Sequence, residues 1–362
     1  MPIRLLMLAD TSTPWALGSK LLQGASEMGL AAADIGVSYT SAAPFFSPSM
    51  ASFPGKIFYR LADRRSLEWW GFQRQIVGLI RDQRPSLVLV TGIMPLASAV
   101  FKAVHDYGGR IVNYLTDDPW NPIHRRRSFL ASLPQYDHIF STKQALRIRL
   151  EAIGACTSWL PFAYDPSLHN PPVPNFMDAE SYRVDVAFVG TGADERLPWL
   201  QALADLSGLR RRIYGNNWRR LPTPGWERQG AVNGEAYTRA ISHARLVLGL
   251  LRQANGDLST DRSYEIGAIG GCGLYRDSSE HRALLTGYPD VGFFSNPAEL
   301  RSNALIILAD PELQDRLRQQ AAEALRKPEH TYAARLRTIL SWGQEGENET
   351  PATMATSPHP DG

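Results

Sequence analysis

An arginine and a glutamate lie at the start of an apolar, glycine-rich segment, DRSYEIGAIGGCGLY, which begins at Asp261. The apolar run Arg245–Leu251 before it predicts a strand, and Thr260 or Asp261 can cap a helix that follows the strand. Backbone N–H groups at a helix N-terminus bind anions, so Arg262 in the first turn could help to hold a phosphate. One turn later, the carboxylate of Glu265 could accept hydrogen bonds from the two hydroxyls of a ribose. The alternative is a capped helix whose first-turn acid faces the helix dipole favourably.

Two glycine-containing turns follow expected strands and could also approach a nucleotide. In the first, VGTG, backbone N–H groups could face a phosphate, although a plain tight turn is an equal alternative. In the second, GNNW, an asparagine could read a base edge and the tryptophan could stack on a base; the alternative is a turn over a core tryptophan. The candidate donor-binding residues of these turns are Gly190, Thr191, Gly192, Gly215, Asn217 and Trp218.

Two adjacent acids, Asp117 and Asp118, follow the expected strand Arg110–Leu115. Carboxylates at this position could orient or deprotonate an acceptor hydroxyl. They could equally form an Asx turn or cap a helix. His105 and His124 are isolated in the sequence, and no His/Asp/Glu cluster has the spacing of a metal site. We therefore expect the acids to act without a metal if they act at all.

Short apolar runs alternate with helical patterns in both halves of the chain, which is typical of α/β proteins with doubly wound parallel sheets. A stretch with four prolines and little periodicity separates the halves. We therefore expect two Rossmann-like domains with ligands bound between them, beyond the carboxyl ends of the strands. The expected parts are an N-terminal (acceptor) domain at 1–162, a linker at 163–183, a C-terminal (donor) domain at 184–328, a helix at 329–344 and a disordered tail at 345–362.

Composition excludes several classes of protein. The net charge of +2 over 362 residues gives no overall field that would attract nucleic acid or acidic membranes. No apolar run reaches eighteen residues, so no membrane span is expected. Two distant cysteines suit a reducing cytoplasm, and the first strand lacks the Gly-x-Gly-x-x-Gly of a plain Rossmann dehydrogenase. Five of the 38 basic residues are lysines, and the arginine runs at 125–127 and 210–212 are interpreted as solvated faces.

Several motifs in order resemble those of GT-B glycosyltransferases, and more narrowly those of the CgeB-like (spore-maturation-protein-like) family. They are DVAFVGTGADERLPWL, YGNNW, DRSYEIGAIGGCGLY, GFFSNPAEL and HTYAARLRTIL, together with NYLTDDPWNP in the N-terminal half. The resemblance covers most of residues 85–340. It implies a GT-B arrangement with an interdomain cleft, in which the last helix crosses back onto the N-terminal domain.

The resemblance also implies transfer of a sugar from a nucleoside diphosphate sugar to an unknown acceptor, with no metal or other cofactor. Many retaining GT-B enzymes carry a Glu-x7-Glu pair: Glu265 matches the second member, which binds the ribose. Asp257 replaces the first, which approaches the donor sugar, so the stereochemical outcome stays open. The candidate catalytic residues are thus Asp117, Asp118 and Asp257, and Arg252 would face the diphosphate. A non-catalytic surface-assembly protein of GT-B fold and a nucleotide-sugar epimerase are the alternatives.

Overall fold

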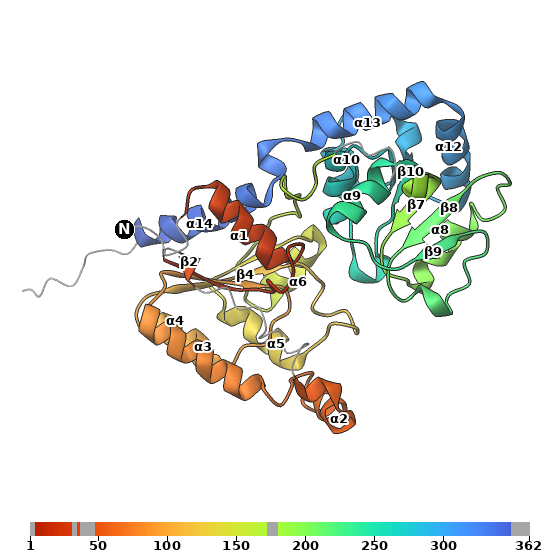
Figure 1. Cartoon of the computed structure of the whole chain (residues 1–362). Helices are drawn as coiled ribbons and strands as arrows, with labels where there is room; N and C mark the ends of the chain where they lie inside the picture. The colour runs from red at the N-terminus through yellow and green to blue at the C-terminus, as the bar shows by residue number, and fades with distance from the viewer. Residues whose placement is uncertain (1–3, 31–34, 37–47, 172–179, 349–362) are drawn as a thin grey trace, which may run out of the picture.

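The computed structural model describes residues 4–30, 35–36, 48–171 and 180–348, which form two α/β domains (Figure 1). Each domain is built on a six-stranded sheet whose neighbouring strands pair in parallel. The strand order is β2-β1-β3-β4-β5-β6 in the first sheet and β12-β11-β10-β7-β8-β9 in the second. The expectation of two Rossmann-like domains is therefore confirmed.

In the N-terminal domain the strands are β1 (Leu5–Leu8), β2 (Ile35–Gly36), β3 (Leu87–Thr91), β4 (Arg110–Leu115), β5 (His138–Ser141) and β6 (Thr157–Trp159). Its helices are α1 (Leu17–Glu27), α2 (Phe53–Leu61), α3 (Trp69–Gln83), α4 (Ser98–His105), α5 (Arg127–Ser132) and α6 (Arg147–Ala152).

In the C-terminal domain the strands are β7 (Val184–Val189), β8 (Arg211–Tyr214), β9 (Glu227–Gln229), β10 (Ala244–Gly249), β11 (Gly273–Arg276) and β12 (Phe293–Phe294). Its helices are α8 (Leu197–Gln201), α9 (Gly234–Ser242), α10 (Asp261–Ile269), α11 (Ser279–Leu284), α12 (Pro297–Ala309) and α13 (Pro311–Leu325), and the long helix α14 (Tyr332–Asn348) follows them.

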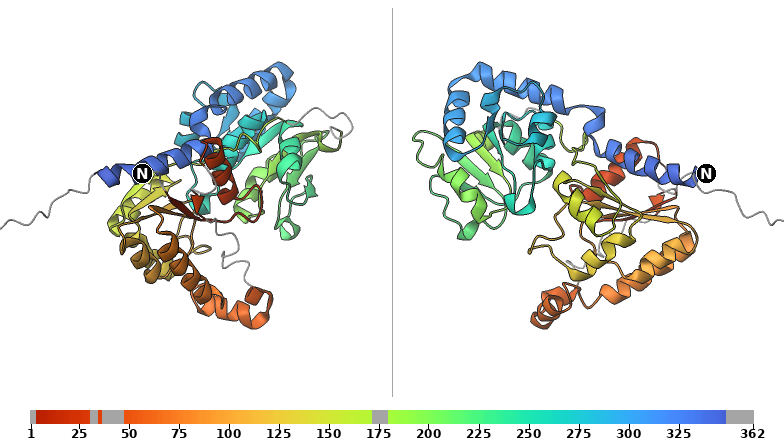
Figure 2. Two further views of the ribbon diagram at one scale, coloured as in Figure 1. Left: turned by 60° about the vertical axis from the view of Figure 1, so that its left-hand side comes forward. Right: turned by 180° about the vertical axis from the view of Figure 1, so that it is seen from behind.

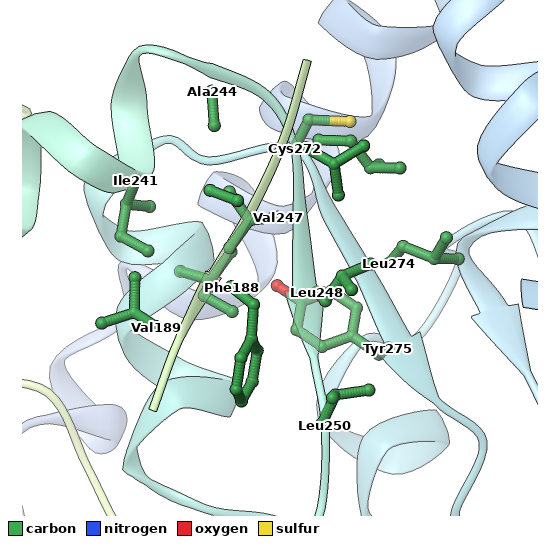
Figure 3. Close-up of a cluster of buried hydrophobic side chains, with 14 of the residues drawn as sticks. Phe188, Val189, Ile241, Ala244, Val247, Leu248, Leu250, Cys272, Leu274 and Tyr275 are labelled. Carbon is green, nitrogen blue, oxygen red and sulfur yellow. The ribbon is translucent and has the colours of Figure 1, made fainter. Parts of the chain in front are cut away.

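Both faces of each sheet are covered, which explains why the strands are continuous apolar runs. Successive side chains of a strand point to opposite faces. On β1, Leu6 and Leu8 pack with α3 and α4, whereas Leu5 and Met7 pack with α1 and α14. In the C-terminal domain, Val247 and Leu248 of the central strand β10 lie in the core beside Tyr275 of β11 (Figure 3).

Helix α14 returns from the C-terminal domain and lies beside α1 on the N-terminal sheet (Figures 1 and 2). Its side chains Tyr332, Leu336 and Ile339 are buried in the same cluster as the outer residues of β1. The close approach of α1 to α14 requires glycine at position 24, because a Cβ there would lie 2.7 Å from the backbone nitrogen of Ala333 in α14. The helix extends to Asn348, beyond the expected end at 344, and residues 349–362 of the expected tail lie outside the described residues.

The sequence suggested that the two arginine runs are solvated faces, but the structure buries some of their side chains. Arg126 is 3% exposed and donates to the backbone oxygen of Ile93 at 2.9 Å. Arg211 donates to two backbone oxygens at 2.6 Å, and Arg212 pairs with Glu227 at 2.6 Å. These guanidinium groups can be buried because carbonyl or carboxylate oxygens accept their N–H groups.

We expect Gly24→Val to lower the free energy of unfolding by about 1–3 kcal/mol, because the new side chain would force α1 away from α14. Gly78→Val is the matched control, since a Cβ at that helical glycine meets open space. It should change the free energy by less than about 1 kcal/mol. Urea titrations of both variants measure the difference, and equal values would show that α1 and α14 are not tightly packed.

Candidate functional site

A cleft of about 380 Å³ lies between the two domains, at the carboxyl ends of strands from both sheets. The N-terminal domain contributes Trp15 and Leu17 from the stretch after β1, and Asp117 from the loop after β4. The C-terminal domain contributes the turn after β7 and the segment that joins β10 to α10. The cleft is therefore where the sequence predicted chemistry.

Cationic side chains outnumber acidic ones among the described residues that line this cleft. The cations are Lys20, Lys143, Arg196, Arg252 and Arg262, and the acids are Asp117, Asp257 and Asp261. Helix α10 also presents its N-terminus here, with Thr260 and Ser263 forming a capping box. An excess of positive charge at a helix N-terminus favours an anionic ligand.

The carboxylate of Glu265 is fully buried, and charged and polar groups surround it. Lys20 donates to Oε1 at 2.8 Å, and Nε2 of His169 lies 3.2 Å from the same oxygen. The hydroxyl of Tyr237 donates to Oε2 at 2.9 Å, and Arg262 pairs with that oxygen too. Because Lys20 belongs to α1, its ion pair with Glu265 joins the two domains.

Electrostatics explain why this buried group stays ionised. Burial alone would raise the pKa of Glu265, but Lys20 and Arg262 hold it well below its ordinary value. Burial lowers the pKa of His169 despite the neighbouring Glu265, which favours the neutral ring. Nδ1 of His169 accepts a hydrogen bond from the backbone N–H of Asp165 at 3.0 Å, which leaves Nε2 to carry the proton of a neutral ring beside the glutamate. Lys20, Tyr237 and Arg262 therefore stabilise one carboxylate through hydrogen bonds, and His169 lies against it.

A second buried pair crosses the cleft between Lys143, which follows β5, and Asp257. Burial raises the pKa of Asp257, and Lys143 opposes that shift. The side-chain amide of Asn255 donates to Asp257 at 3.1 Å and to Asp117 at 3.2 Å. Asn255 also accepts the backbone N–H of Asp118 at 3.1 Å. One asparagine thus positions the two carboxylates that face each other across the cleft.

The structure separates Asp118 from Asp117. Asp117 lines the cleft, whereas a carboxylate oxygen of Asp118 accepts the backbone N–H of Trp120 at 2.8 Å. Arg149 lies 3.7 Å from the other oxygen and stacks on the Trp120 ring. Asp118 therefore forms an Asx turn, which was the alternative considered for this pair of acids.

The glycine turns divide in a similar way. Gly190 and Thr191 line the cleft, but Gly192, Gly215, Asn217 and Trp218 are absent from the residues that line it. Trp218 is 3% exposed, and its indole N–H donates to the backbone oxygen of Gly190 at 2.8 Å. A Cβ at Gly215 would lie 2.1 Å from the same oxygen. The alternative of a turn over a core tryptophan therefore describes this motif, which supports the Gly190 turn from behind.

Arg252 and Arg262 both line the cleft. Arg262 lies over the ring of Tyr237, 4.6 Å from its centre, and pairs with Asp261 as well as with Glu265. Arg262 and Glu265 also line a smaller cavity of about 90 Å³ beside the cleft. Other residues of that cavity include Trp15, Lys20, His169, Asn233 and Tyr237.

Sequence reasoning missed Lys20, Lys143, Arg196 and Asn255. Arg196 stacks on the ring of Phe188 at 5.1 Å and donates to the backbone oxygen of Thr191. Burial lowers the pKa of Arg196 to about 10. The scarcity of lysine was a usable signal, since two of the five lysines in the chain form the interdomain pairs.

The described residues contain no group of three or more His, Cys, Asp or Glu side chains placed to hold a metal ion. Within the same residues, no helix combines the length and apolarity needed to cross a bilayer.

We expect Lys20→Met to lower the free energy of unfolding at neutral pH by about 3 kcal/mol, because it leaves a buried carboxylate short of a partner. The deficit should shrink as the pH falls, because Glu265 of the variant lacks the lysine that holds its pKa low and therefore becomes protonated at a higher pH than Glu265 of the parent. Lys102→Met removes an exposed pair with Asp106 and should cost less than about 1 kcal/mol. Urea titrations at pH 7 and pH 4 test this, and equal losses for the two lysines at pH 7 would contradict it.

Comparison with known proteins agrees with this geometry. A family described as glycosyl transferase-like matches residues 196–341. No curated protein matches the chain in sequence.

Solved structures of similar fold cover nearly the whole chain. Sucrose-phosphate synthase from Thermosynechococcus elongatus is 10% identical with a TM-score of 0.64, over 96% of this chain and 99% of its own. The T4 phage enzyme BGT, solved with its UDP-glucose substrate, is 13% identical with a TM-score of 0.57, and the match covers 93% of this chain and 98% of that one. A candidate UDP-N-acetylglucosamine 2-epimerase from Listeria monocytogenes is 12% identical with a TM-score of 0.55, over 98% of both chains. The chain thus shares the two-domain GT-B fold of these structures, and residues 196–341 match a glycosyl transferase-like family.

Proposed function

We propose that the protein is a glycosyltransferase, related to the CgeB-like family, which transfers a sugar from a nucleoside diphosphate sugar to a hydroxyl group of an acceptor. The observation that carries this proposal is the cleft itself. It brings the N-terminus of α10, five cationic side chains and two facing carboxylates into one space between the domains. The match of the C-terminal domain to a glycosyl transferase-like family supports it.

In the proposed reaction, the bond between the anomeric carbon and the donor phosphate breaks, and a bond to the acceptor oxygen forms. The diphosphate leaves with the electron pair, and Arg252 and Arg196 stabilise its charge together with α10. Asp117 receives the acceptor proton. Asp257 approaches the donor sugar, in the place of the first glutamate of the Glu-x7-Glu pair.

The ribose of the donor would bind Glu265. A carboxylate has about four lone-pair sites; Lys20, Tyr237 and Arg262 donate to the oxygens of Glu265, and Nε2 of His169 crowds Oε1 at 3.2 Å. A ribose hydroxyl can therefore bind only if one neighbour withdraws. Lys20 is the neighbour that belongs to the other domain, so donor binding would weaken the link between the domains.

The test of the function is release of a free nucleoside diphosphate from a nucleotide-sugar donor in the presence of cell extract as the acceptor source. We expect release with at least one of UDP-, GDP-, dTDP- or ADP-glucose, and we expect EDTA to leave the rate unchanged because protein cations neutralise the diphosphate. An epimerase would instead convert the donor into another nucleotide sugar without extract. A non-catalytic protein would bind the donor and release nothing.

Asp117→Asn should lower turnover by about 100-fold or more, because the variant cannot accept the acceptor proton. The affinity for the nucleotide should change by less than about twofold, because Asp117 belongs to the opposite domain. Asp118→Asn is the matched control: its turn role should leave turnover within a few-fold of the parent. Turnover rates and nucleotide titrations of both variants measure this, and an equal loss at the two positions would rule out a distinct role for Asp117.

Glu265→Gln should weaken binding of UDP and of uridine alike, by tenfold or more, because a hydrogen bond to a charged group contributes about 1.5–3 kcal/mol. Arg252→Ala should weaken UDP more than uridine, since it faces the diphosphate. Calorimetry on folded variants gives the affinities.

Glu280→Gln provides the control for removing a buried carboxylate of the same domain. Its carboxylate accepts a hydrogen bond from Ser259 at 2.5 Å, and it should leave both affinities unchanged. If the Glu265 variant binds UDP as tightly as the parent, Glu265 serves the domain interface and not the ribose.

A further inference from the structure

Helix α2 carries large apolar side chains that the rest of the described chain leaves exposed. Phe53, Ile57 and Leu61 recur every four residues and are 76%, 44% and 83% exposed. Residues at this spacing share one side of a helix. The buried residue of α2 is Gly55, whose N–H is capped by the Ser52 hydroxyl at 3.1 Å. The helix protrudes from the N-terminal domain at the end opposite the helices α12 and α13 (Figures 1 and 2).

Two further residues with exposed apolar side chains contact arginines of the segment that follows α2. Trp70 is 54% exposed, and the guanidinium of Arg65 lies 5.6 Å from the centre of its ring. Ile123 is 58% exposed, and Arg64 donates to its backbone oxygen and, at 3.1 Å, to that of Pro122. We call these five apolar residues and their basic neighbours the α2 face.

The charge of the α2 face is basic. Its exposed basic residues are Lys56, Arg60, Arg125 and Arg127. The acids nearby are engaged in local structure. Asp63 accepts the backbone N–H groups of Arg127 and Ser128 at 2.8 and 2.7 Å, at the start of α5. Glu68 accepts the backbone N–H of Ser49 at 2.8 Å. Helix α2 itself carries no acid.

We propose that the α2 face docks on an anionic lipid bilayer. An apolar stripe flanked by basic residues suits the boundary between headgroups and acyl chains, where the stripe leaves water and the cations meet anionic headgroups. A net charge of +2 supplies no overall attraction, so the concentration of cations at this end of the molecule provides it.

The position of the face bears on what the cleft could reach. Ile123 belongs to the loop that starts at the carboxyl end of β4, and Asp117 of the same loop lines the cleft. Docking through the α2 face would therefore hold the N-terminal wall of the cleft beside the bilayer. This inference is independent of the proposed transfer reaction, because it depends on the exposed face and not on the cleft.

Sedimentation with sucrose-loaded vesicles tests the proposal. The full chain should bind vesicles of phosphatidylcholine with 40% phosphatidylglycerol, and vesicles of phosphatidylcholine alone much more weakly. Lys56→Glu/Arg60→Glu should lower the partition coefficient by about 25-fold or more, since each basic residue near an anionic surface contributes roughly a factor of five. Phe53→Ser/Leu61→Ser should lower it by about tenfold or more.

Matched controls lie on the C-terminal domain. Ile306 is 53% exposed on α12, and the side chain of Arg316 is 58% exposed on α13. Ile306→Ser/Arg316→Glu should bind vesicles like the parent. Absence of binding by the parent would overturn the proposal, as would equal binding by all variants. Self-association that Phe53→Ser/Leu61→Ser abolishes, in a parent that does not bind vesicles, would assign the face to a second copy of the chain.

Discussion

The arrangement of the two domains depends on how one buried carboxylate is neutralised. Glu265 has no exposed surface, and an ionised group in that position is tolerated only with partners. Its own domain supplies Arg262 and Tyr237, but Lys20 comes from α1 of the other domain. The pair fixes where α1 meets α10. Lys143 and Asp257 form a second buried pair of the same kind between the domains.

These pairs have a consequence for ligand binding: the carboxylates that could bind a ligand are the same groups that hold the two walls of the cleft together. Lys20 neutralises Glu265, Lys143 neutralises Asp257, and all four residues border the cleft or the smaller cavity beside it. A ligand that binds to either acid competes with a lysine of the opposite domain. A ligand that displaces a lysine in this way would favour whichever arrangement of the two domains it binds more tightly.

Much of the fold could be predicted from the sequence, because buried parallel strands are short apolar runs and the helix at Asp261 carries its own capping signal. Strand β9 escaped prediction, since its residues are exposed at a sheet edge and lack an apolar pattern. The cleft was predicted from the ends of strands. The partners of its acids were not, because Lys20 and Glu265 are 245 residues apart and no local pattern links them. Likewise, Trp218 is buried against the ring of Phe188, and sequence spacing does not reveal this contact.

The course of α14 has a consequence for synthesis of the protein. The outer side chains of β1 pack against Tyr332, Leu336 and Ile339 as well as α1, and these α14 residues are translated more than 300 residues after β1. The inner face of the same sheet is completed early, by α3 and α4. A nascent chain therefore carries a half-covered sheet throughout translation of the second domain, and this exposed apolar surface is prone to aggregation until α14 docks.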